Sequence, residues 1–131
     1  MKTEICHFWV GNFKSEDLFY DFFEEDKRFY ENESNSDGYV SEFSASQSEN
    51  WIDFDFLECG FENNAKPVNE KFGKYSYAAK WMDALETKIN ALNLTDLNAI
   101  AFINKSEIEN PVSVNRKNFD LHYLGEIEYE V

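Results

Sequence analysis

The chain has 131 residues, of which 43% are hydrophobic and 18% aromatic, and it carries 26 acidic against 12 basic residues. This size and apolar content predict one domain with one core, residues 1–131, and exclude a chain that is disordered over most of its length. The formal net charge of −14 argues against direct binding of nucleic acid, because an acidic surface repels phosphates.

The negative charge is concentrated in one part of the chain. Residues 15–65 contain 15 Asp and Glu, but their only basic residues are Lys27 and Arg28, so their local net charge is −13. The rest of the chain is nearly neutral, at −1. One-sided acidity of this size produces a field that attracts basic partners. We therefore expect the partner to be a cationic protein.

The first predicted element is a strand over residues 4–11, because this segment is apolar on both faces and rich in strand formers. Ser15 is a suitable N-cap for an amphipathic helix over 15–26, and acidic residues favour the positive end of that helix. Its apolar residues recur at helical spacing on one face: Leu18, Phe19, Phe22 and Phe23. Residues 29–37 have little apolar content and are expected to form an exposed loop that closes at Gly38.

The middle of the chain has a mixed pattern. Residues 40–50 are compatible with a short helix that serines weaken. Residues 51–58 alternate partway between aromatic and acidic, which favours either a half-buried strand or a tight helical turn with an acidic face. Residues 66–74 are expected to form a loop. A helix is predicted over 75–92, where an apolar stripe runs through Ala78, Trp81, Met82, Leu85, Ile89 and Leu92.

Two further strands are predicted near the end of the chain. Residues 97–103 are almost continuously apolar, whereas in 121–130 apolar residues alternate with Glu126, Glu128 and Glu130. These glutamates are expected to face water and to protect their edge from adding another chain. The predicted fold is α+β, with a small, mainly antiparallel sheet from 4–11, 97–103 and 121–130 covered on one side by helices 15–26 and 75–92.

The cysteines and histidines give little support for chemistry. Cys6 and Cys59 lack metal-type spacing, so both are expected to be reduced, buried thiols. His7 and His122 fall within predicted strands, which favours hydrogen-bonded core histidines over ligands. No catalytic residue, metal or cofactor is therefore predicted. No run approaches the roughly 20 apolar residues that span a bilayer, so a cytoplasmic protein without a membrane segment is expected.

Three segments of the chain carry a family resemblance. They are residues 7–16 with the Phe-rich acidic helix that follows, residues 53–58, and residues 123–129. Together they resemble the immunity protein 22 family over essentially the whole chain. The resemblance implies a bacterial polymorphic-toxin immunity protein: a small α+β protein kept in the cytoplasm, which binds a toxin domain, often a nuclease, without catalysis or a cofactor. It supplies no contact residues, because immunity families vary most where they meet their toxins.

The acidic segment itself supplies candidate toxin-binding residues. A nuclease binds a polyanion and so has a positively charged cleft, which clustered carboxylates can occupy. Carboxylates also steer the encounter and accept charge-assisted hydrogen bonds from Arg and Lys, while aromatic side chains anchor the interface. The candidates are Glu31, Glu33, Asp37, Tyr39, Glu49, Trp51, Asp53, Asp55 and Glu58. We expect the protein to act as a monomer.

Three other interpretations stay open at this point. The acidic residues could form a solvated face that contacts nothing. The protein could instead be an acidic adaptor or nucleic-acid mimic that binds a host nucleic-acid-binding protein. Finally, the carboxylates could hold a divalent ion such as Mg²⁺ or Ca²⁺ in a hydrolase, although the sequence contains no calcium-loop spacing.

Overall fold

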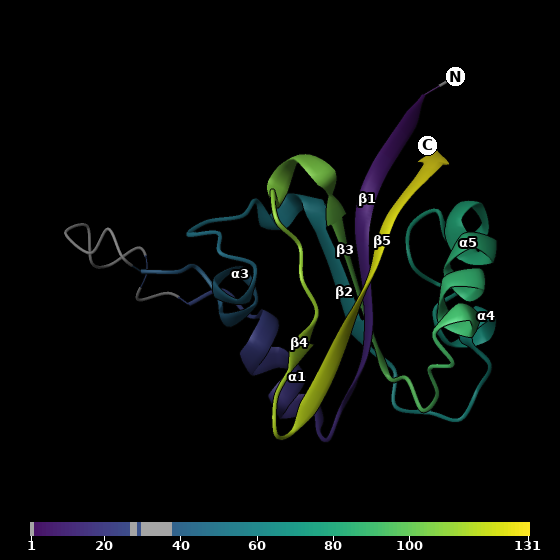
Figure 1. Cartoon of the computed structure of the whole chain (residues 1–131), viewed down its shortest axis with the longest axis horizontal. Helices are drawn as coiled ribbons and strands as arrows, with labels where there is room; N and C mark the ends of the chain where they lie inside the picture. The colour runs from purple at the N-terminus through teal and green to yellow at the C-terminus, as the bar shows by residue number, and fades with distance from the viewer. Residues whose placement is uncertain (1, 27–28, 30–37) are drawn as a thin grey trace.

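Figure 1 shows a computed structural model of the chain, in which residues 2–26, 29 and 38–131 are described. Within these residues, five antiparallel strands form one sheet in the order β2-β3-β1-β5-β4. The strands are β1 Thr3–Phe13, β2 Leu57–Phe61, β3 Ala99–Asn104, β4 Val114–Asn115 and β5 Phe119–Glu130. This arrangement confirms the predicted α+β class and the mainly antiparallel sheet.

Strand β1 occupies the centre of the sheet because both of its faces are apolar. It pairs with β3 on one side and, along its whole length, with β5 on the other. The register with β5 shifts between Phe8 and Trp9, as in a β-bulge. Gly11 is required at its position, since a Cβ there would lie 2.1 Å from the backbone oxygen of Asp120.

Helices lie on both faces of the sheet (Figure 1). They are α1 Glu16–Phe23, α3 Glu42–Ser46, α4 Val68–Lys71 and α5 Ala78–Ala91. Helices α1 and α3 cover the face that carries Trp9, whereas α4 and α5 cover the face that carries Phe8. The prediction that helices 15–26 and 75–92 cover the same side is therefore wrong. The reason is that β1 directs alternate apolar side chains to opposite faces, so each face requires its own helical cover.

Each face of the sheet has its own aromatic core. Beneath α5, Phe8 stacks on Phe102 with ring centroids 4.7 Å apart, and Trp81 packs against both rings. Beneath α1 and α3, Phe13 stacks on Phe119 with ring centroids 4.3 Å apart. Aromatic side chains bury a large apolar area each, so the two cores together fix the sheet between its helical layers.

The structure also resolves the mixed middle of the chain. Residues 40–50 contain α3, which begins with a capping box formed by two serines. Residues 51–58 contain a 3-10 turn, η1 (Phe54–Phe56), followed by the start of the edge strand β2. The loop predicted over 66–74 is wrong in part, because the residues after Pro67 form α4.

Strand β5 shows the alternation predicted for it. Ile127 and Tyr129 are buried against the α5 side of the sheet. The alternate glutamates are exposed: Glu126, Glu128 and Glu130. In α5 the predicted apolar stripe is buried except for Leu92, which lies at the C-cap and is 54% exposed.

Candidate functional site

A cleft of about 210 Å³ opens at the end of the sheet where both termini lie (Figure 1). It lies between the η1 turn with strand β2 on one side and the start of α5 on the other. Three carboxylates line it, from Glu4, Asp55 and Glu58, together with two aromatic side chains that are about half exposed, Phe56 and Tyr77. The cleft is therefore both acidic and apolar.

Local hydrogen bonds build the first wall of the cleft. The Asp53 carboxylate accepts the N–H of Asp55 at 2.9 Å and so caps the η1 turn. The N–H of Asp53 in turn donates to the carboxylate of Glu107 at 2.8 Å. This short turn leaves Asp55 and Phe56 facing solvent at the rim. Asp53 thus stabilises the η1 turn, and the carboxylate of Asp55 carries the negative charge at the rim of the cleft.

The opposite wall is the segment that leads into α5. The Glu58 carboxylate reaches across the cleft and accepts the N–H of Ser76 at 2.7 Å. The carbonyl of Ser76 accepts the indole N–H of buried Trp81 at 2.8 Å. The next residue, Tyr77, has a φ of 58°, in the left-handed region that non-glycine residues rarely adopt. The ring centroid of Tyr77 lies 6.2 Å from that of Tyr129.

The floor of the cleft holds a thiol and a phenol in contact. The Sγ atom of Cys6 lies 3.4 Å from the hydroxyl oxygen of Tyr129. Burial raises the pKa of both groups, and the charges of Glu4 and Glu58 raise both pKa values further. A nucleophilic cysteine requires a lowered pKa, so the environment of Cys6 is the opposite of one that activates a thiol.

The structure separates the predicted toxin-binding residues. Asp55 and Glu58 line the cleft. Glu49 instead accepts the N–H of Glu109 at 3.2 Å, and Asp53 caps η1 as described above. The two aromatic candidates are exposed but lie outside the cleft: Tyr39, 44% exposed, and Trp51, 50% exposed. Three of the candidates lie outside the described residues: Glu31, Glu33 and Asp37.

Sequence reasoning missed one carboxylate and both half-exposed aromatic side chains of the cleft. Glu4, Phe56 and Tyr77 come from three separate segments, and no local pattern connects them. Phe56 had the clearest signal, because it stands among acidic residues in a run whose periodicity matched neither a regular strand nor a regular helix. Only the pairing of β1 with β3 and of β2 with β3 brings Glu4 towards η1.

The histidines and cysteines match their predictions only in part. His7 is buried, with Nδ1 2.8 Å from the Tyr123 hydroxyl and Nε2 3.1 Å from the carbonyl oxygen of Ile108, which confirms a hydrogen-bonded core histidine. His122 is only half-buried in β5. Both cysteines are free, and Cys6 is buried as predicted, but Cys59 is half-buried on edge strand β2.

Across residues 2–26, 29 and 38–131, no group of three or more His, Cys, Asp or Glu side chains is arranged to hold a metal ion. In the same part of the chain, no helix has both the length and the apolar character needed to cross a membrane.

Comparison with known proteins identifies the family. A family model described as Immunity protein 22 matches residues 6–130, nearly the whole chain. The chain belongs to the immunity protein 22 family. The predicted resemblance is thereby confirmed, and membership of this immunity protein family indicates a toxin-neutralising role. No curated protein and no solved structure matches the chain.

Proposed function

We propose that this immunity protein 22 family member binds a cognate bacterial toxin domain in the cytoplasm and blocks it by covering its substrate-binding surface. The family match supports the toxin-neutralising part of this proposal. The charge of the chain supports a basic nuclease as the toxin. A net charge of −14 favours a cationic partner, and a nuclease needs a basic cleft to bind its polyanionic substrate. Inhibition by occlusion is stoichiometric and requires no cofactor.

The acidic and aromatic cleft is the observation that carries the proposal. Asp55 and Glu4 supply negative charge beside the rings of Phe56 and Tyr77, each about half exposed. A lysine or arginine side chain fits such a surface, because its aliphatic stem packs on an aromatic ring while its cation meets a carboxylate. Exposed aromatic residues within an acidic rim also match the usual composition of an interface anchor.

A growth experiment tests the immunity role directly. The open reading frame adjacent to this gene would be induced in a heterologous bacterium with and without the immunity protein. We expect the neighbour to stop growth alone and to be harmless when co-expressed, with the two proteins co-purifying as a one-to-one complex. A toxic neighbour that is unaffected by co-expression would overturn the proposal. An acidic adaptor would leave the toxicity of the neighbour unchanged, and it would be recovered with a host protein instead.

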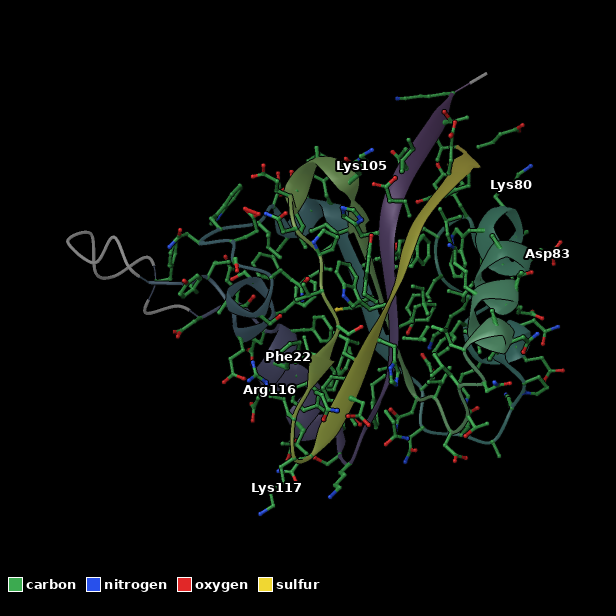
Figure 2. The ribbon with its side chains drawn as sticks, viewed as in Figure 1. Phe22, Lys80, Asp83, Lys105, Arg116 and Lys117 are labelled. Carbon is green, nitrogen blue, oxygen red and sulfur yellow. The ribbon has the colours of Figure 1, made fainter. Side chains whose placement is uncertain are left out.

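A charge reversal tests the cleft as the contact site. Asp55→Lys should slow association with the purified toxin by about tenfold at low ionic strength, because rim charges act mainly on the on-rate. Asp83→Lys is the matched control, since Asp83 projects from the outer side of α5, away from the sheet (Figure 2). Both substitutions change the net charge equally. Equal on-rates for the two variants would exclude the cleft from the interface without affecting the immunity role.

A further inference from the structure

Within the part of the chain that the structure describes, one side of strand β5 lacks a strand partner over about half of its length. Strand β4 pairs only with Asp120 and Leu121, and the Ser113 hydroxyl accepts the N–H of Tyr123 at 2.8 Å. From Leu124 to Glu130, β5 pairs only with β1 among the described residues. In Figure 1, the half of β5 that runs to the C-terminus has no strand on the side facing the viewer. This stretch, 124–130, is called the open edge below.

The register identifies which backbone groups the open edge presents. The N–H of Val131 donates to the carbonyl of Lys2 at 3.0 Å, which places the backbone groups of Val131 on the β1 side. In an antiparallel ladder, successive residues direct their N–H and C=O groups alternately to the two sides. Tyr129 and Ile127 therefore bond to β1. The backbone groups that point away from β1 belong to Glu126, Glu128 and Glu130.

The side chains of the same glutamates give the open edge its charge. All three are exposed on the face of the sheet opposite α5. Glu126 lies 3.3 Å from the ammonium of Lys105, in the 3-10 turn η2 (Lys105–Glu107) that follows β3. Within the described residues, Glu128 and Glu130 form no salt bridge. An incoming strand would therefore meet unpaired donors and acceptors next to two uncompensated carboxylates.

The negative charge of the open edge determines which kind of strand can pair with it. A second copy of the chain, added edge to edge, would place glutamates near glutamates, and like charges across a strand pair are destabilising. A strand with lysine or arginine at alternate positions would instead form cross-strand ion pairs and complete the ladder. Tyr129 lies between two of these glutamates in β5, but its buried side chain points to the opposite face of the sheet, where it lines the acidic and aromatic cleft.

We propose that the open edge of β5 binds an extended basic strand of the toxin by β-augmentation, with backbone pairing at Glu126, Glu128 and Glu130. The inference rests on the proposed function for the identity of the partner. It assigns to the glutamates a second role besides protection of the edge: they reject another copy of this chain and accept a cationic strand.

The first test uses the protein with a synthetic peptide, Lys-Val-Lys-Thr-Lys-Val-Lys, and a twin peptide N-methylated on every residue, which blocks both edges of the strand. Backbone pairing should slow hydrogen exchange of the three outward glutamate amides by at least ~10-fold, since they gain hydrogen-bond partners. The N-methylated twin carries the same charge but cannot pair, so it should leave these amides fast. Absence of binding, or binding of both peptides without selective slowing of these amides, would overturn the inference.

The second test compares Glu128→Pro with Glu128→Ala in the toxin rescue and affinity measurements. Both remove the charge, but only proline removes the outward N–H, and edge strands tolerate proline where the N–H faces solvent. We expect proline to weaken toxin binding at least ~10-fold more than alanine. If the two variants bind equally while wild-type rescue is intact, the open edge is not used and the immunity role stands. If wild-type protein fails to rescue, the proposed function itself fails.

Discussion

The side chain of Asn98 substitutes for a backbone partner of Phe13. Its Oδ1 atom accepts the N–H of Phe13 at 2.9 Å, and its Nδ2 atom donates to the carbonyl oxygen of Phe13 at 2.9 Å. The β1–β3 ladder has already ended at Gly11 and Ala99, so Asn98 extends the pairing of β1 with a side chain. Buried backbone groups require such partners because an unsatisfied donor or acceptor is costly.

Asn98→Ala should therefore destabilise the protein by about 2 kcal/mol, since it leaves two buried backbone groups of Phe13 without partners. The measurement is urea unfolding followed by circular dichroism. Asn63→Ala is the control, because Asn63 is exposed, and its effect should stay within about 0.5 kcal/mol. Equal effects of the two substitutions would show that the Asn98 bridge does not contribute to stability.

The two leucines of the α5 stripe should respond very differently to truncation. Leu85 is fully buried, so Leu85→Ala should lower the free energy of unfolding by about 3 kcal/mol through lost burial and a residual cavity. Leu92 is 54% exposed at the C-cap, and Leu92→Ala should cost less than about 1 kcal/mol. Thermal and urea unfolding check both values. A cost at Leu92 as large as that at Leu85 would contradict an exposed C-cap at Leu92.

Substitution of Tyr77 should lower toxin affinity without lowering the stability of the protein. Its left-handed backbone conformation is unfavourable for a tyrosine, so Tyr77→Gly should leave stability unchanged or raise it by up to about 1 kcal/mol. Toxin affinity should nevertheless fall, because the ring lines the cleft. Asn93→Gly, also at positive φ, should gain less, since asparagine tolerates this conformation, and should leave affinity intact. A loss of stability without a loss of affinity at Tyr77 would contradict a binding role for its ring.

Stability should fall at alkaline pH, and Cys59 should account for part of the loss. Burial raises the pKa of Cys59 from 9.0 to about 12, with a smaller contribution from Glu58. Above pH 9 the thiol of the unfolded chain therefore ionises while the folded thiol stays protonated, which favours unfolding as the pH rises towards 12. Cys59→Ala should make the decrease shallower, by at most about 1.4 kcal/mol per pH unit. Identical slopes for both proteins in urea unfolding between pH 8 and 10 would contradict this.

Individual elements were predictable where a few neighbouring residues decide them. The N-cap at Ser15 and the alternation around Ile127 both appear in the structure as the sequence indicated. The short elements were harder, because α4 and β2 depend on contacts that their own residues do not encode. Leu92 shows the same limit, since its spacing continues the apolar stripe but the helix ends before it.

The sequence by itself determined the antiparallel α+β class, the central apolar strand and the location of the acidic charge along the chain, because periodicity and composition are local properties. Only the tertiary structure decided which face each helix covers, since β1 offers an apolar face on either side. The tertiary structure also decided which residues form the cleft and which part of β5 is left as the open edge. Glu4, Asp55 and Tyr77 meet only through strand pairing, and whether β5 has an outer partner depends on how far β4 extends.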